Sequence, residues 1–521
     1  MNALVNPMLL FTTFIAILAI CAIWTVLGLS ANKNKKRYHP VAGTILHLLL
    51  NFERYHDYLN DLTRRNTTFR ILYPDNSEIY TSDPANVEHI LKTNFANYGK
   101  FKDTKLRLYR KLNFAGSLHY DILKDLLGDG IFTVDGEKWR HQRKMSSYEF
   151  STRNLKEFSS GVFKTNAAKL AHIVSAAVTS NQTIEIQDMF MKSALDSVFK
   201  VVLGVDLDIM RGTNEESTQF SEAFDKASEL TCYRYVDISW PVKKFLNIGT
   251  EATLKKCIKV VDAFVYKVIQ SKIEQISKPN ETISVNKGDI LSRFLEMNET
   301  DPKYLKDIIL SFIIAGKDTT ASALSWFFYM MCKHPLLQEK IVQEVREAAK
   351  IQENSRIDEI AESITEEALD KMQFLHASLS ETLRLYPALP QDGKVCFSDD
   401  TFPDGFSVKK GNMVTYVPYA MGRMKSLWGE DAEEFRPERW LDENGIFQQQ
   451  SSFKFTAFQG GPRICLGKEF AYRQMKVFAA VLLSAFSFKL ADESKTVKYR
   501  TMLTLQIDGG LHLRATCRIA N

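Results

Sequence analysis

The sequence lacks any regular pattern of cysteines. Its seven cysteines are scattered over 521 residues, and no two of them form a Cys-x-x-Cys pair. Structural zinc sites and disulfide frameworks both need cysteines at characteristic spacings, so this scatter argues against either. A reducing, cytosolic environment is the simpler interpretation.

A strong charge imbalance is also missing. The 67 Lys and Arg residues against 62 Asp and Glu residues give a net charge of +5, which is too small to indicate a nucleic-acid partner. No low-complexity tract is present, and no glycine-rich signature for nicotinamide or flavin is evident. The composition, 45% hydrophobic and 25% charged, is that of a globular protein.

One stretch lacks charge altogether. Residues 8–29 are uncharged and largely apolar, and a helix needs ~20 such residues to span a bilayer. A secretory signal peptide would carry a basic residue before a shorter apolar core, but the first charged residue here is Lys33. Four basic residues follow the run: Lys33, Lys35, Lys36 and Arg37. The positive-inside rule then places the N-terminus outside and the remaining chain in the cytosol.

These features predict a protein held in the endoplasmic reticulum membrane by a single transmembrane signal-anchor. The predicted segments are a short lumenal N-terminus (1–7), the anchor (8–29), a basic stop-transfer segment and hinge (30–43), and a domain facing the cytosol (44–521). Because that domain would never enter the lumen, all four glycosylation sequons are expected to stay unused. The sequons are at Asn66, Asn181, Asn280 and Asn298.

One cysteine near the C-terminus has an unusual setting. Cys465 lies within Phe458-Gln-Gly-Gly-Pro-Arg-Ile-Cys-Leu-Gly467, just before a predicted helix. Glycines let backbone N–H groups approach a sulfur closely, and a helix N-terminus biases a cysteine towards the thiolate. Such a loop suits an axial ligand to haem iron. The alternative is a buried cysteine before an amphipathic helix.

This decapeptide fits the pattern Phe-x-x-Gly-x-Arg-x-Cys-x-Gly at every fixed position, and the chain thereby resembles the cytochrome P-450 (haem-thiolate monooxygenase) superfamily. The resemblance implies a mainly α fold with small β-sheets, preceded here by one transmembrane helix. It implies haem b bound at Cys465, with Phe458 beside it. It also implies electrons from NADPH through a separate membrane-bound reductase.

A basic segment around residue 140 is a second candidate for cofactor binding. Trp139 and Arg143 are four residues apart and share one face of a helix. A solvated basic helix with one buried tryptophan would have the same pattern. The resemblance implies that the two side chains bind one haem propionate and Arg463 the other, through the planar donor fork of arginine.

Residues 307–333 are apolar nearly all round, which predicts a buried helix. A second membrane span is unfavourable, because Lys317 and Asp318 would lie near the bilayer centre. Small and polar residues within such a helix tend to mark a functional site, and threonine hydroxyls there can bond back to carbonyls four residues earlier. Ala315-Gly-Lys-Asp-Thr-Thr320 resembles the superfamily's oxygen-activation motif. This implies a hydrogen bond from Thr319 towards the oxygen and proton relay by Asp318.

Glu381 and Arg384 are three residues apart and can pair on one helix, although this pattern alone is a weak signal. The resemblance adds Arg439, from Phe435-Arg-Pro-Glu-Arg-Trp440, and implies a buried three-residue network behind the haem.

Most of residues 38–521 is similar to the plant fatty-acid ω-hydroxylase clan, which implies ω-hydroxylation of long-chain fatty acids such as cutin or pollen-wall precursors. The chain departs from these relatives at Gly460, where alanine is usual, and in a basic insertion at about 101–118. A terpenoid or steroid is the alternative substrate. A peroxide-rearranging lyase or isomerase would not need Asp318 and Thr319. A non-catalytic haem protein would not need the full set of motifs.

Five basic residues around these motifs predict a positive face that would steer an acidic reductase. Simple solubility is an equally good explanation of the same charges. The residues are Arg140, Lys144, Lys468, Arg473 and Lys476.

Overall fold

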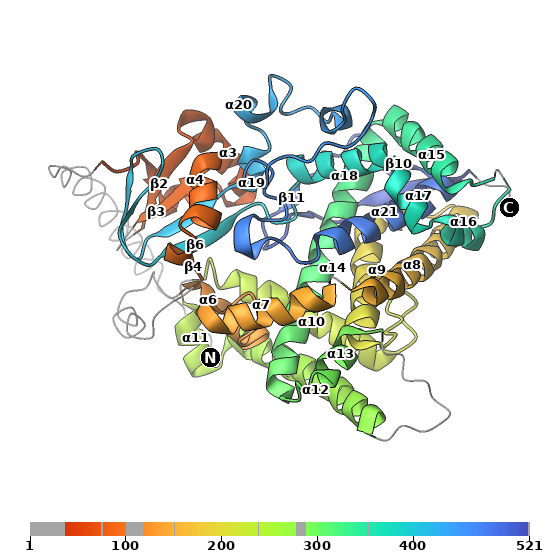
Figure 1. The fold of residues 1–521 in the computed structure, drawn as a ribbon, viewed down its shortest axis with the longest axis horizontal. Coiled ribbons are helices and arrows are strands. Elements are labelled where there is room, and N and C mark those ends of the chain that lie inside the picture. The colour runs from red at the N-terminus through yellow and green to blue at the C-terminus, as the bar shows by residue number, and fades with distance from the viewer. Residues whose placement is uncertain are drawn as a thin grey trace, which may run out of the picture.

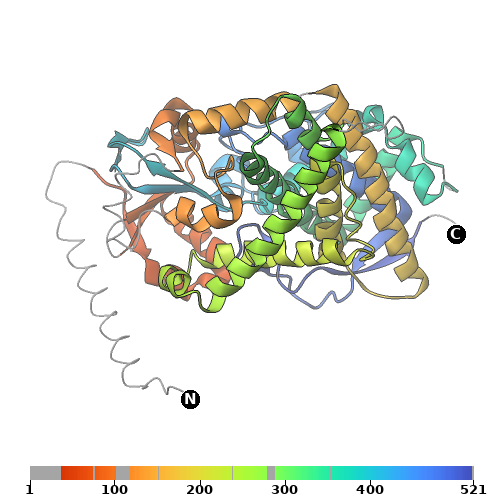
Figure 2. The ribbon, with the colours of Figure 1, turned by 90° about the horizontal axis from the view of Figure 1, so that it is seen from below.

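The computed structural model describes residues 37–73, 77–100, 118–150, 152–237, 239–277, 288–352 and 354–518. The predicted anchor at 8–29 and all but the last residue of the insertion at 101–118 lie outside these residues. The described chain is mainly helical with several small sheets, as predicted. Strands of the largest sheet lie at one end of the molecule and most of the helices at the other, where β10 also lies (Figures 1 and 2).

The long helix predicted at 307–333 is α14 (Pro302–Lys333), which crosses the middle of the molecule (Figure 1). It packs on α9 (Ile186–Leu203), α18 (Gln373–Leu385) and α21 (Lys468–Ala485). Among the described helices it alone is long and apolar enough to cross a membrane, but 78% of its most apolar window is buried inside the protein. It is therefore a core helix, as the charges in its middle predicted.

The remaining helices lie on both sides of α14 in the sequence. They are α2 (Ile45–Leu50), α3 (Tyr55–Arg65), α4 (Pro84–Glu88), α6 (Leu118–Leu127), α7 (Gly136–Phe150), α8 (Arg153–Thr179), α10 (Glu215–Tyr233), α11 (Trp240–Leu246), α12 (Gly249–Ser277), α13 (Ile290–Glu296), α15 (Pro335–Ala349), α16 (Ile357–Ser363), α17 (Glu366–Lys371), α19 (Pro418–Met421) and α20 (Lys425–Trp428). Short 3₁₀ or π turns are η1 (Phe52–Arg54), η2 (His89–Thr93), η3 (Phe95–Asn97), η4 (Pro437–Trp440) and η5 (Gly461–Arg463).

The largest sheet has six strands in the order β1-β2-β3-β9-β6-β4. Within it, β2 and β3 pair antiparallel, with Thr68 opposite Thr81. The strands are β1 (Val41–Thr44), β2 (Thr68–Leu72), β3 (Ser77–Thr81), β4 (Tyr98–Gly99), β5 (Ile184–Glu185), β6 (Asp392–Cys396), β7 (Asp400–Thr401), β8 (Ser407–Val408), β9 (Met413–Tyr416), β10 (Phe486–Leu490), β11 (Tyr499–Arg500), β12 (Gln506–Ile507) and β13 (His512–Cys517).

The predicted boundary between hinge and domain, at residue 44, falls at the end of β1. β1 pairs in parallel with β2 and so belongs to the sheet. Just before it, His39 is buried, and its Nε2 lies 3.0 Å from a carboxylate oxygen of Asp404. The end of the predicted hinge at 30–43 is therefore part of the fold, because the sheet needs β1 to cover β2.

Two hydrophobic cores meet at α14. Residues 305–314 pack in one core with α9, α10 and α12. Several residues from Ala321 onwards pack in the other, with α8 and α21. The small and polar residues 315–320 lie between the two cores. The tertiary fold therefore opens the middle of this helix onto a cavity.

Candidate active site

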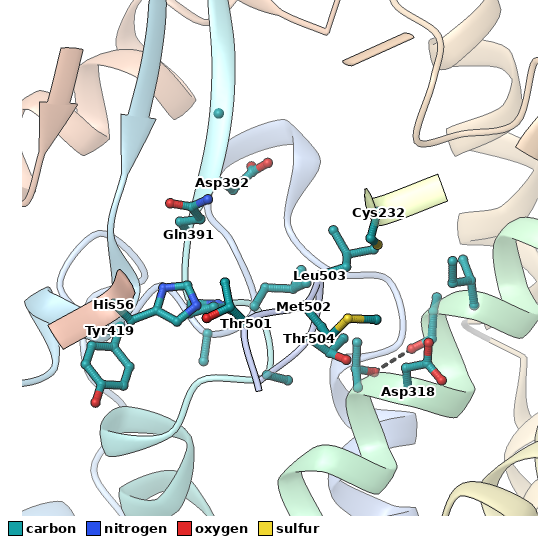
Figure 3. Close-up of a pocket in the computed structure, with 18 of the residues that line it drawn as sticks. His56, Cys232, Asp318, Gln391, Asp392, Tyr419, Thr501, Met502, Leu503 and Thr504 are labelled. Atoms are coloured by element: carbon teal, nitrogen blue, oxygen red, sulfur yellow. Dashed lines mark hydrogen bonds between the residues drawn. The ribbon is translucent and has the colours of Figure 1, made fainter. Parts of the chain in front are cut away.

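One large cavity collects the side chains that the sequence predicted for the site. Its volume is about 1940 Å³, and it reaches from α14 to the segment 496–504, part of which is drawn in Figure 3. The predicted cofactor-binding and catalytic residues all line it: Trp139, Arg143, Asp318, Thr319, Phe458, Arg463 and Cys465. These residues are far apart in the chain, so only the fold brings them together.

Cys465 sits in a tight loop before α21. Its backbone N–H donates to the carbonyl of Phe458 at 2.8 Å, and the Gly467 amide donates to its sulfur. Gly461 has φ +63°, and a Cβ there would lie 1.9 Å from the carbonyl oxygen of Leu91, so only glycine lets the loop pack. Cys465 is exposed and lines the cavity, while its neighbours in the loop are mostly half-buried.

Burial raises the pKa of the Cys465 thiol above its ordinary value. The Gly467 amide and the charges of Arg143 and Lys468 lower it by less. Desolvation and the predicted bias towards the thiolate therefore act in opposite directions on this thiol. A coordinating iron would deprotonate the thiol, since a metal ion is the largest local charge in its site.

The two arginines at the site have donors without partners. Arg463 donates from Nη2 to Asp135 Oδ1 at 2.5 Å, and its guanidinium lies 4.4 Å from the Trp139 ring centre. Its buried Nε has no hydrogen-bond partner among the described residues. Arg143 is half-buried and forms no ion pair within the described ranges, and burial lowers the pKa of both arginines.

Partly buried cations of this kind call for an anionic partner. The donors, the exposed sulfur and the cavity between them fit haem, which carries two propionates and an iron that takes a cysteine ligand.

An ion cluster at the same cavity was missed by the sequence analysis. Asp392 accepts from Lys100 Nζ at 2.8 Å and also pairs with Lys394. Burial lowers the pKa of Lys394 to about 7, while Asp392 opposes that shift. The alternation Asp392-x-Lys394 on a strand was the only local signal, because Lys100 comes from a distant part of the chain.

Another wall of the cavity is formed by α14, which carries Asp318 and Thr319, the residues predicted to act on the oxygen. The Thr319 hydroxyl donates to the Ala315 carbonyl at 2.5 Å, as predicted for a threonine within this helix. Asp318 does not bond to Thr319. Its Oδ1 accepts from Lys317 Nζ at 3.1 Å, and Lys317 also pairs with Asp225 on α10.

Lys317 is buried, and burial alone would lower its pKa, but the carboxylates of Asp318 and Asp225 raise it above the ordinary value. The lysine therefore stays charged inside the helix bundle. Gly316 lets α9 approach, because a Cβ there would lie 2.7 Å from Val198. The charged residue in the middle of α14 thus has a tertiary partner that no local pattern revealed.

The predicted charge network behind the cysteine loop is present. Glu381 and Arg384 have fully buried side chains joined at 2.7 Å, and Arg439 Nε lies 2.8 Å from Glu381 Oε1. The indole of Trp440 also donates to Glu381, at 2.9 Å, which the sequence analysis did not foresee. Each carboxylate oxygen therefore has more than one donor.

The predicted positive face is smaller than expected. Lys476 is buried, donates to the Leu369 carbonyl, and has its pKa lowered by burial to about 8. Arg473 pairs with Glu366 at 3.0 Å. Arg140 pairs with Glu137, so Lys144 and Lys468 are the members of the predicted face without an ion pair among the described residues.

Comparison with known proteins covers nearly the whole chain. A family model described as Cytochrome P450 matches residues 36–513. Cytochrome P450 704C1 of Pinus taeda is 50% identical and aligns with 99% of this chain and 99% of its own length. Cytochrome P450 704B1 of Arabidopsis thaliana is 42% identical over 94% of this chain and 95% of its own. Cytochrome P450 94A1 of Vicia sativa is 36% identical over 91% and 88%, respectively.

Proposed function

This chain belongs to the cytochrome P450 family of haem monooxygenases, which take electrons from NADPH through a reductase, and we propose that it ω-hydroxylates long-chain fatty acids. The observation that carries this substrate class is the shape of the cavity. Asp318 lies at one end and Tyr419 at the other, with Met502 and Leu503 between them, so the cavity suits an extended apolar chain (Figure 3). The plant relatives, at up to 50% identity, support the same assignment.

When bound, haem b would activate O₂ for insertion of one oxygen atom into a C–H bond. Cys465 would hold its iron, because its sulfur is the cysteine sulfur exposed at the base of the cavity. Trp139 and Arg143 would bind one propionate and Arg463 the other, which would give the unused Nε of Arg463 an acceptor. Phe458, which lines the same cavity, would pack beside the cysteine loop.

Thr319 and Asp318 would hold and transfer protons at the wall of the cavity that α14 forms. The hydroxyl of Thr319 is fixed by its bond to Ala315, which leaves its oxygen lone pairs directed to other donors. Asp318 is held by Lys317, so it must exchange that partner to pass a proton into the cavity. The two hydrophobic cores around α14 hold the helix in place on either side of these residues.

Thr319→Ala is expected to separate electron consumption from product formation. Without the hydroxyl, proton delivery loses its fixed position, and product formed per NADPH consumed should fall roughly tenfold or more. The missing electrons should appear as hydrogen peroxide, which is measured beside product and NADPH. Thr319→Ser keeps the hydroxyl and should stay close to wild type. Normal coupling in Thr319→Ala would contradict the assigned role.

The substrate proposal is tested by spectral titration of the haem-loaded protein with fatty acids of graded length. We expect saturable binding that tightens with chain length and, with reductase and NADPH, a terminal hydroxyl on the product. A terpenoid or steroid is the alternative, and parallel titrations with both classes provide the comparison. If no fatty acid binds while a polycyclic lipophile does, the fatty-acid assignment is wrong and the monooxygenase assignment stands.

We further propose that residues 8–29 anchor the protein in the endoplasmic reticulum membrane with the catalytic domain in the cytosol. Exposed apolar side chains support this, since Leu50, which lines the cavity from α2, is 76% exposed and Phe245 on α11 is 88% exposed. α2 and the end of α10 both line the cavity, so a lipophile can enter from lipid. Glycosidase treatment of the native protein should give no mass shift, and a shift would reverse the topology.

A further inference from the structure

The far end of the cavity contains a histidine without hydrogen bonds. His56, in the first turn of α3, is only 2% exposed, and neither of its ring nitrogens has a partner among the described residues. Burial, with a smaller contribution from Arg423, lowers its pKa to about 3, so the ring is neutral. A neutral imidazole offers one donor and one acceptor, and buried polar groups of this kind are normally satisfied.

A cation without a carboxylate partner lines the same end. Arg423 uses Nη1 to donate to the carbonyls of Leu385 at 2.5 Å and Tyr419 at 3.1 Å. Its guanidinium also lies 3.7 Å from the centre of the Tyr419 ring. It forms no ion pair within the part of the chain that the structure describes, and its Nε and Nη2 are unused there. These two nitrogens form a fork that suits a carboxylate.

The neighbouring polar groups are already engaged. The hydroxyls of Tyr419 and Tyr499 both donate to Asp57, at 2.7 and 3.1 Å. Tyr55 donates to Gln391 at 3.2 Å. Asp57 therefore has its oxygens occupied and is not within ion-pair distance of Arg423. These hydrogen bonds leave the ring nitrogens of His56 and the Nε and Nη2 of Arg423 without a partner among the described residues.

The location of His56 and Arg423 in the cavity indicates what kind of ligand they could bind. In Figure 3, His56 and Tyr419 lie at one end of the cavity and Asp318 at the other, with residues 501–504 between them. The cavity therefore has two polar ends, which Trp326, Met502 and Leu503 help to separate. A ligand that matches this pattern has a polar head and a long apolar chain.

We propose that His56 and Arg423 form the head-group site of the substrate. A neutral His56 donates a hydrogen bond to one carboxylate oxygen, and the Arg423 fork binds the carboxylate from the other side. The distance from this site to Thr319 then selects chain length and places the terminal carbon at the reactive wall. The inference rests on the proposed fatty-acid function and names the residues that bind the carboxylate of the fatty acid.

The test compares hexadecanoic acid with its methyl ester in spectral titrations of the full-length, haem-loaded protein. His56→Phe keeps the ring packing against Tyr55, Tyr419 and Tyr499 but removes the donor. It should weaken binding of the acid by about tenfold, or ~1.4 kcal/mol, and leave the ester within about twofold. His56→Gln keeps a donor and should restore part of the difference. The hydroxylation products of His56→Phe should also spread from the terminal carbon to positions within the chain.

Thr501→Val is the matched control, because this neighbouring side chain already donates its hydroxyl to the Phe52 carbonyl. It should leave the ratio of acid to ester affinity unchanged. Equal weakening of acid and ester in His56→Phe, or no change in either, would overturn the head-group site while leaving fatty-acid hydroxylation intact. Failure of the wild-type protein to bind any fatty acid would instead overturn the proposed function, and the head-group site with it.

Discussion

Cys465→Ser is expected to abolish the reduced carbon-monoxide band that marks a thiolate-bound haem, together with all monooxygenase activity. Cys465 alone among the predicted site residues combines a sulfur exposed to the cavity with a glycine-lined loop. A serine hydroxyl would fit the loop, but its oxygen does not supply the electron density of a thiolate. The loss should therefore be chemical, with the fold intact, and far-ultraviolet circular dichroism should stay unchanged.

Cys232 provides the control for this experiment. It is a second free cysteine that lines the same cavity, and burial raises its thiol pKa to about 11. It lacks the glycine loop and the helix that follows Cys465. Cys232→Ser should keep the band and the activity. A band that survives in Cys465→Ser, or disappears in Cys232→Ser, would show that the ligand has been wrongly assigned.

Glu381→Ala is expected to yield protein that binds little or no haem. Both oxygens of the Glu381 carboxylate are hydrogen-bonded, and its removal leaves the buried Arg384 and Arg439 without their shared anion. Breaking a buried ion network by removing one partner costs ~3–5 kcal/mol. Because the free energy of unfolding of a folded protein is only ~5–15 kcal/mol, a loss of that size removes a large part of it.

The measurement is the haem content per protein after purification, with the thermal midpoint of the fraction that stays folded. Glu438→Ala is the matched control, since Glu438 lies in η4 beside Arg439 but pairs with Lys340 in solvent at 3.0 Å. An exposed pair contributes little, so this variant should load haem normally. Normal haem content in Glu381→Ala would mean that the network is not needed to hold the cysteine loop.

The sequence determined those parts of the site whose chemistry lies within one turn or loop. The cysteine loop around Cys465, the Thr319 hydroxyl bonded four residues back, and the Glu381–Arg384 pair all follow from spacing along a single segment. Local rules suffice there, because residues three or four apart on a helix must meet. The apolar pattern of residues 307–333 likewise predicted a buried helix before its neighbours were known.

Only the tertiary structure decided which partner each buried charge has. Asp225 faces Lys317 from another helix, and Arg423 lies beside His56 although the two are far apart in sequence. No periodicity encodes such pairs, because they depend on which helix surfaces pack together. Packing likewise sets how strongly desolvation acts on the Cys465 thiol, which the residues of the loop do not determine by themselves.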